Sequence, residues 1–158
     1  MEAKEYMQRI IEISSKKLVL FDEILLFARS QNEVIKGKRY EEMDPLLKER
    51  KKRMDAVDKL DEQFVVYSSR LKDTIGITTL EELPQVNVPG TSELKSLVEK
   101  IGQKLVQIKE LDDENSAGIK TEMKDTRENI NNTSAHKRAT GAYYPMGNTT
   151  SYYFDKKK

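Results

Sequence analysis

The sequence predicts an all-α fold: an elongated antiparallel helical hairpin or bundle of three long helices, ending in a flexible C-terminal tail. Residues 3–36 contain no glycine or proline, and their apolar residues recur at intervals of three and four, which is the helical period. Apolar residues make up 37% of the 158-residue chain and charged residues 35%, which suits helices that bury one stripe each. The 28 basic and 27 acidic residues nearly cancel, so net charge gives no reason to expect disorder.

The first predicted helix carries two adjacent apolar rows. One row is a heptad seam with two polar interruptions, Lys17 and Gln31, and a second row lies beside it. Because two rows make a broad apolar face, we expect this helix to pack against more than one neighbour. Gly37 is the expected stop, since glycine commonly follows the last helical residue. The seam consists of Tyr6, Ile10, Ile13, Leu20, Ile24, Phe27 and Val34, and the second row of Met7, Ile11, Leu18, Phe21, Leu25 and Ala28.

The second predicted helix follows after a short break. Asp44 and Pro45 are expected at its N-cap and first helical position, although Tyr40 and Met43 leave open a start near residue 39 with a kink. Gly76 is expected to end it. Joined by a short connection, the first two helices should form an antiparallel hairpin. The apolar stripe of this helix consists of Leu46, Leu47, Met54, Val57, Leu60, Phe64, Tyr67 and Leu71.

Residues 77–91 are expected to connect the hairpin to a third helix. Thr78 and Thr79 are each followed by a glutamate three residues later, which predicts a short capped turn. Two prolines and a glycine come next and prevent a longer element. Thr91 or Ser92 is then the expected N-cap of the third helix.

The third helix has a normal core face up to Leu111 and a sparse one beyond it. That face consists of Leu94, Leu97, Val98, Ile101, Leu105, Ile108 and Leu111. Farther on, the large aliphatic residues are Ile119, Met123 and Ile130, spaced by four and seven. The free energy gained by burying three such side chains barely offsets the conformational entropy lost by ordering about thirty other residues. We therefore expect residues 112–140 to be helical but weakly docked or frayed, with this stripe lacking an evident partner inside the chain.

The sequence offers no catalytic or metal-binding constellation. It has no cysteine, and its one histidine, His136, lies in a polar stretch, which excludes a structural zinc site. No phosphate-binding loop or nucleophile motif is present. Acidic pairs such as Asp112 and Asp113, and the basic run at residues 48–53, are expected to be solvated helix faces. We therefore expect no enzyme activity, no catalytic residue, no metal or other cofactor, and no nucleic-acid partner.

Membrane insertion and secretion are not expected either. The N-terminus is charged from residue 2 and lacks the apolar core of a signal peptide. Apolar runs stay far below the ~18 residues of a membrane span. A cytoplasmic location is the simplest interpretation.

The C-terminal stretch GAYYPMGNTTSYYFDKKK, residues 141–158, differs from the rest of the chain. It holds four of the seven tyrosines, and no helical period orders them. Gly141 is the expected end of the third helix, so we divide the chain into a helical unit, residues 1–140, and a flexible tail, residues 141–158. Paired aromatic residues outside any core favour contact with a partner.

Taken together, these features resemble the FlgN-type flagellar export chaperones. The hairpin is similar to the family's long first helix, short break and charged second helix, and a long third helix likewise follows a proline-containing connector. In the tail, Tyr143-Tyr144-Pro145-Met146-Gly147 is similar to a Tyr-Asn-Pro-x-Gly-like stretch of the family. The ending Phe154-Asp155-Lys156-Lys157 resembles the aromatic-Asp-Lys-Lys ending of Gram-positive members.

This resemblance implies two partners. One is a flagellar hook-associated protein, which joins the hook to the filament. The resemblance implies that the chaperone covers the C-terminal amphipathic helices of this client until export. The candidates for client contact are then Ile119, Met123 and Ile130. The other is the cytoplasmic domain of the type III export gate. Tyr143 is the gate-docking candidate, with Tyr144 as the alternative and Gly147 in the same stretch.

A structural coiled-coil module without a client is the alternative hypothesis. It predicts self-association through the seam of the first helix, whereas a chaperone is expected to be a monomer or a weak homodimer. The sequence indicates no role for three aromatic residues of the tail, Tyr152, Tyr153 and Phe154.

Overall fold

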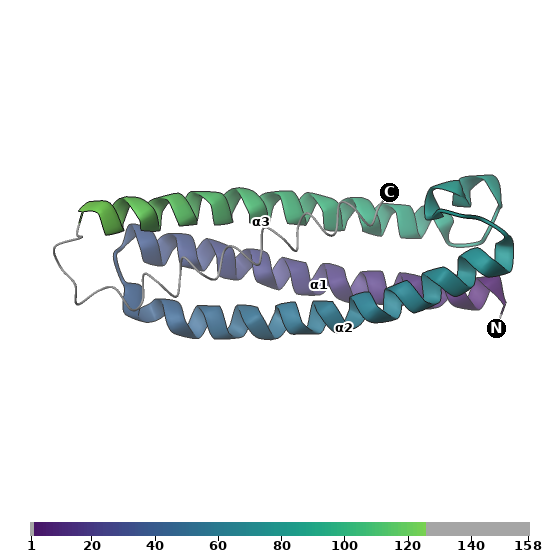
Figure 1. The fold of residues 1–158 in the computed structure, drawn as a ribbon, viewed down its shortest axis with the longest axis horizontal. Helices are drawn as coiled ribbons and strands as arrows, with labels where there is room; N and C mark the ends of the chain where they lie inside the picture. The colour runs from purple at the N-terminus through teal and green to yellow at the C-terminus, as the bar shows by residue number, and fades with distance from the viewer. Residues whose placement is uncertain (1, 126–158) are drawn as a thin grey trace.

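Three long helices lie side by side in an elongated bundle (Figure 1). The computed structural model describes residues 2–125; residue 1 and residues 126–158 lie outside the described part of the chain. The elements are α1 (Ala3–Lys36), a 3₁₀ turn η1 (Tyr40–Glu42), α2 (Met43–Ile75), a second 3₁₀ segment η2 (Leu80–Gln85) and α3 (Thr91–Asp125). α1 and α3 run in one direction and α2 in the other, so α1 and α2 form the predicted antiparallel hairpin. The predicted all-α fold is confirmed.

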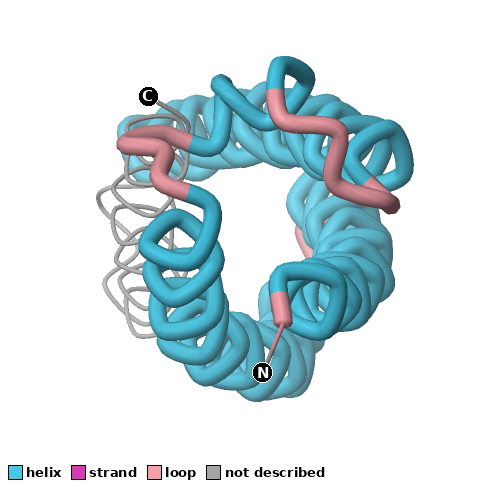
Figure 2. The backbone as a smooth tube through the Cα atoms, turned by 90° about the vertical axis from the view of Figure 1, so that its right-hand side faces the viewer, coloured by secondary structure: helices cyan, strands magenta, loops and turns pink. Residues whose placement is uncertain are grey.

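α1 is the helix against which both others pack. Its backbone is close to that of α2 and of α3, whereas α2 and α3 approach each other mainly through side chains. The view along the bundle shows the three helices arranged around a common axis (Figure 2). The two apolar rows of α1 explain this position, because one row alone could cover only one neighbour. The expectation that this helix has more than one neighbour is therefore confirmed.

The turn between α1 and α2 differs from the expectation in one detail. α1 ends at Lys36, but Gly37 keeps a right-handed backbone (φ −86°), and the left-handed residue is Lys38 (φ 55°). The amide of Lys38 donates to the carbonyl of Ile35, and that of Arg39 donates to the carbonyl of Val34. These two bonds form a Schellman motif with Lys38 at the C′ position. A Cβ at Gly37 would lie 3.1 Å from the Arg39 guanidinium, so the Arg39 side chain would have to shift by a few tenths of an ångström.

α2 begins earlier than the Asp44 cap predicted. η1 runs directly into α2, whose first residue is Met43, so Asp44 and Pro45 are its second and third residues. Proline is tolerated there because the first-turn amides of a helix have no acceptor within that helix. Burial of Met43, which has no exposed surface, favours the earlier start. At the other end Gly76 adopts the left-handed conformation expected of a glycine stop (φ 73°).

The connector closes one end of the bundle. Thr79 and Glu82 form the predicted capping box, and two backbone amides donate to the Glu82 carboxylate at 2.8 Å. Thr91 does not cap α3 but is its first residue; its hydroxyl donates to the Val88 carbonyl at 2.7 Å. Gly90 precedes it with φ +95°, and a Cβ there would lie 2.8 Å from Ile11 Cδ1. A glycine is therefore required where the connector crosses the start of α1.

The core divides into three clusters along the bundle axis. The connector-end cluster consists of Met7, Ile10, Ile11, Leu71, Leu83, Val88 and Leu94. The central cluster consists of Phe21, Ile24, Leu25, Val57, Ile101, Leu105 and Ile108. The distal cluster, at the end where α1 turns into α2, is smaller and consists of Val34, Ile35, Met43 and Ile119.

Candidate functional site

The distal end of the bundle holds two of the three predicted client-contact residues. Ile119 has no exposed surface and belongs to the distal cluster, and Met123 packs against that cluster while partly buried. Nearby, α3 approaches α1 closely, since a Cβ at Gly118 would lie 3.2 Å from Ile35 Cγ2. The expectation that this stripe lacks a partner inside the chain is therefore wrong for Ile119.

Helix length and direction explain why Ile119 is covered. α1 has 34 residues and α3 has 35, and the two run in the same direction. The last turns of α3 therefore reach the C-terminal end of α1, where Val34 and Ile35 are available. Residues 112–125 are accordingly helical and packed against the hairpin. Ile130 and the remainder of the predicted weak segment lie outside the described residues.

Between the central and distal clusters lies a buried polar layer, which we define as Gln31, Arg50, Asp112 and Asn115. These four residues come from all three helices, and each residue is at most 5% exposed. The Arg50 guanidinium donates two hydrogen bonds to the Asp112 carboxylate, one of them 2.8 Å long, and a third, 2.7 Å long, to Gln31 Oε1. The layer thus ties α2 to α1 and to α3 at one level of the bundle.

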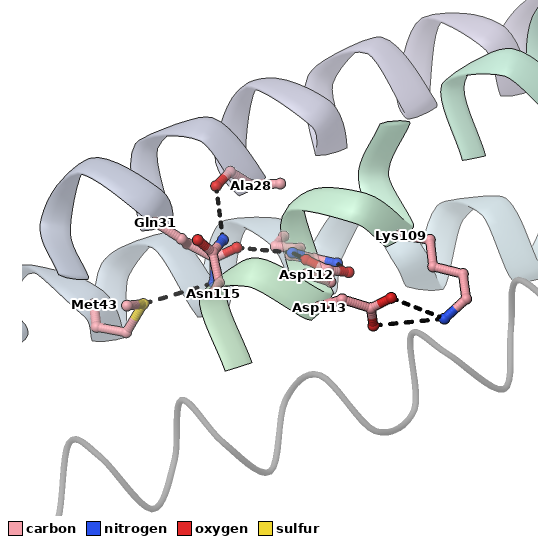
Figure 3. A network of polar contacts seen from close by, with 8 residues as sticks. Ala28, Gln31, Met43, Lys109, Asp112, Asp113 and Asn115 are labelled. Carbon is pink, nitrogen blue, oxygen red and sulfur yellow. Dashed lines mark hydrogen bonds and ion pairs between the residues drawn. The ribbon is translucent and has the colours of Figure 1, made fainter. Parts of the chain in front are cut away.

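Hydrogen bonds extend the layer on both sides (Figure 3). Asn115 Nδ2 donates to the Ala28 carbonyl at 3.0 Å, and Asn115 Oδ1 accepts from Asn32 Nδ2 at 2.7 Å. Gln31 Nε2 approaches the Met43 sulfur at 3.6 Å, which reaches into the distal cluster. Burial raises the pKa of Asp112, and the hydrogen bonds and charge of Arg50 oppose that rise.

This layer corrects two expectations about charged residues. The pair Asp112 and Asp113 was expected to be solvated, yet Asp112 is buried while the side chain of Asp113 is 69% exposed beside Lys109. The basic run at 48–53 was expected to be a solvated face, yet Arg50 points inward. Lys51 and Lys52 are exposed as expected, and Arg53 pairs with Glu23 and Glu49.

A second buried ion pair lies between the central and connector-end clusters. Lys17, the first interruption of the seam, places Nζ 3.1 Å from Asp61 and 4.5 Å from the centre of the Phe64 ring. Both interruptions of the seam, Lys17 and Gln31, therefore mark buried polar contacts. A polar residue at a core position is therefore a sequence signal for a buried polar contact. α3 shows the same signal, because Asp112 and Asn115 occupy positions in its row of buried residues. With steps of three and four, that row is Ile101, Leu105, Ile108, Asp112, Asn115 and Ile119.

The other predicted site residues are not covered by the structure. Tyr143, Tyr144 and Gly147, the gate-docking candidates, lie outside the described residues, as does His136. Within residues 2–125, no group of histidine and acidic side chains is arranged to hold a metal ion. Over the same residues, no helix combines the length and apolar character that a membrane span requires.

The seam of the first helix is not available for the predicted self-association. Ile10, Ile13 and Ile24 are at most 5% exposed, because α2 and α3 cover this face of α1 within the chain. A dimer through this seam would require the bundle to open first. Self-association through this seam would therefore compete with the packing inside the chain, and the alternative hypothesis stays a prediction.

Over residues 2–125 the fold is that of an elongated, all-α three-helix protein. Comparison with family models gives a match to the family described as FlgN protein over residues 1–151. The chain belongs to this family, which confirms the predicted resemblance to FlgN-type chaperones. Comparisons with curated proteins and with solved structures gave no match.

Membership has general consequences for function. FlgN proteins are flagellar export chaperones that bind flagellar proteins, and the family is not known for enzymatic activity. The matched range includes Tyr143, Tyr144 and Gly147, whereas Tyr152 and the rest of the ending lie beyond it.

Proposed function

We propose that this protein is a cytoplasmic type III export chaperone that binds the C-terminal amphipathic helices of flagellar hook-associated proteins. It would keep these helices from associating prematurely and deliver the hook-associated proteins to the export gate. The family match over residues 1–151 is the observation that carries the proposal. The bundle supports it, because an elongated helical surface suits recognition of a partner helix.

The client site is proposed at the distal end of the bundle, around Ile119, Met123 and Ile130. Ile119 is buried in the free chain, so a direct client contact there requires the distal end of α3 to move. Met123 is only partly buried and lies at the rim of the distal cluster, where a client helix could extend the apolar surface. Ile130 lies seven residues after Met123 and continues the same helical face in the sequence.

Calorimetry with circular dichroism tests client binding. A synthetic peptide of the C-terminal amphipathic helix of a hook-associated protein is titrated into the full chain. We expect heat of binding and more helicity than the sum of the two free components, because the peptide folds as it binds. An absence of both signals across the junction proteins of a flagellated bacterium would overturn the proposal.

The tail is proposed to dock the export gate through Tyr143, with Tyr144 as the alternative and Gly147 as part of the same stretch. Deleting residues 141–158 should leave the heat of client binding unchanged and abolish binding to the cytoplasmic gate domain. If the deletion abolishes client binding instead, the client site lies in the tail.

A further inference from the structure

The polar layer divides the core into unequal parts. On one side lie the central and connector-end clusters, with seven buried residues each, and on the other lies the distal cluster with four. The layer is built from side chains of α1, α2 and α3, so it crosses the whole bundle. An apolar core tolerates small slips of packing, but the bonds of Arg50 are directional and hold only one alignment of the helices.

We propose that the polar layer acts as a latch: the distal end of α3 opens from the hairpin as a unit, up to the layer, while the rest of the bundle stays folded. Opening exposes Val34, Ile35 and Met43 on the hairpin and Ile119 on α3. The further step, that a client helix occupies this exposed surface, rests on the proposed function.

Contacts beyond the layer favour separate opening. Lys38 pairs there with Glu122 at 3.6 Å, and its side chain is 67% exposed whereas that of Glu122 is 16% exposed. An ion pair whose lysine is exposed to solvent is screened more than one that is buried on both sides. The apolar contacts of α3 beyond Asn115 are those of Ile119 within the distal cluster and of Met123 against it.

Contacts at the layer itself set the boundary of the opening unit. The side chains of Arg50 and Asp112 are each 6% exposed, so separating them would leave two charges in poorly hydrated surroundings. The Gln31 bond depends on the same guanidinium. Because the Arg50 guanidinium donates both to Gln31 of the hairpin and to Asp112 of α3, it holds α3 to the hairpin at this level, which sets a boundary for the opening unit.

Thiol labelling in the folded protein tests the latch. The chain has no cysteine, so one introduced thiol reports one position. Val34→Cys places a thiol in the distal cluster, the distal thiol, and Val57→Cys places one in the central cluster, the central thiol. Both valines are buried, and the two substitutions are identical.

We expect the distal thiol to react with a thiol reagent at least about tenfold faster than the central thiol, a difference of about 1.4 kcal/mol in opening free energy. Equal rates would overturn the proposal, because both positions would then open only by global unfolding.

A variant without the latch supplies the second test. Gln31→Leu, Arg50→Met and Asp112→Leu combined replace three of the four polar side chains of the layer with apolar ones and leave Asn115, which removes the ion pair that bounds the opening unit. Labelling of the distal thiol should then slow toward the rate of the central thiol. The matched control is Lys109→Met with Asp113→Leu, which removes an exposed pair of the same charges and should leave the rate of the distal thiol unchanged. If both variants change that rate equally, the layer has no special role.

Client binding separates this inference from the proposed function. The latch-free variant should bind the hook-associated peptide about tenfold more weakly than the wild type, whereas the control variant should bind normally. If the distal thiol labels faster than the central thiol but the chain binds no peptide, the latch is supported and the client is refuted. If the chain binds peptide while the two thiols react equally, the latch is refuted and the proposed function stands.

Discussion

Replacing Arg50 with methionine should lower the free energy of unfolding by about 3–5 kcal/mol, the usual cost of removing one partner from a buried ion pair. Arg50 donates to both carboxylate oxygens of Asp112 and to Gln31. The ion-pair side chains are 6% exposed, so water cannot replace the lost donors. Methionine retains much of the apolar stem of arginine, so the loss reports mainly the stranded carboxylate and not a cavity.

Urea unfolding followed by circular dichroism measures this loss. Lys109→Met is the control, because Lys109 pairs with Asp113 in a position where both side chains are at least 50% exposed. Its effect should stay within about 0.5 kcal/mol. A loss below about 1 kcal/mol for Arg50→Met would refute the reasoning, because the layer would then behave like a surface ion pair.

The pH dependence of the Arg50→Met variant gives an independent check. Burial already raises the pKa of Asp112, and Arg50 opposes this rise, so removing Arg50 raises the pKa further. A carboxyl group with a higher pKa in the folded state binds its proton more readily there, so folding is favoured as pH falls. The penalty of the substitution should therefore be largest at neutral pH and shrink in acid. A penalty that grows in acid would contradict the buried carboxylate.

Three further predictions concern single sites. Ile119→Ala should lower the free energy of unfolding in urea by about 2–5 kcal/mol, as for other buried isoleucines. Val106→Ala on the same helix, at a residue 44% exposed, should lower it far less. Equal losses would contradict burial of Ile119. Gly90→Ala should cost about 1–3 kcal/mol through its left-handed backbone, and an unchanged melting temperature would contradict that conformation. Hydrogen bonds from the amides of the connector lower the pKa of Glu82, so its contribution to stability is lost only as pH falls through that lowered pKa; an ordinary glutamate titration by NMR would contradict the capping box.

The order of the helices and some of their ends followed from the sequence because they depend on local rules. Heptad spacing placed the buried face of α1, Gly76 marked the end of α2, and Thr79 with Glu82 marked the turn in the connector. Lys38 shows the limit of such rules, since it takes the left-handed position expected of the neighbouring glycine. There the turn geometry overrides the preference of the residue.

The polar layer did not follow from the sequence, because pairing across helices depends on their axial alignment. Arg50 lies seven residues from Met43 and from Val57, which is the spacing of core positions on a helix. Because Arg50 is charged and belongs to the basic run at 48–53, it was instead interpreted as part of a solvated face. Its partner Asp112 is 62 residues away. The same long-range alignment decides that Ile119 meets Val34 and Ile35. Local spacing identified the helical face of Ile119 but not what covers it.

Thiol labelling in the presence of the client peptide tests the central claim, that a client helix binds at the distal end of the bundle. The Val34→Cys and Val57→Cys chains are labelled with and without a saturating C-terminal helix peptide of a hook-associated protein. We expect the peptide to slow labelling of the distal thiol at least about tenfold by covering the distal cluster, and to leave the rate of the central thiol unchanged. Heat of binding with no change at the distal thiol would contradict it and place the client elsewhere on the chain.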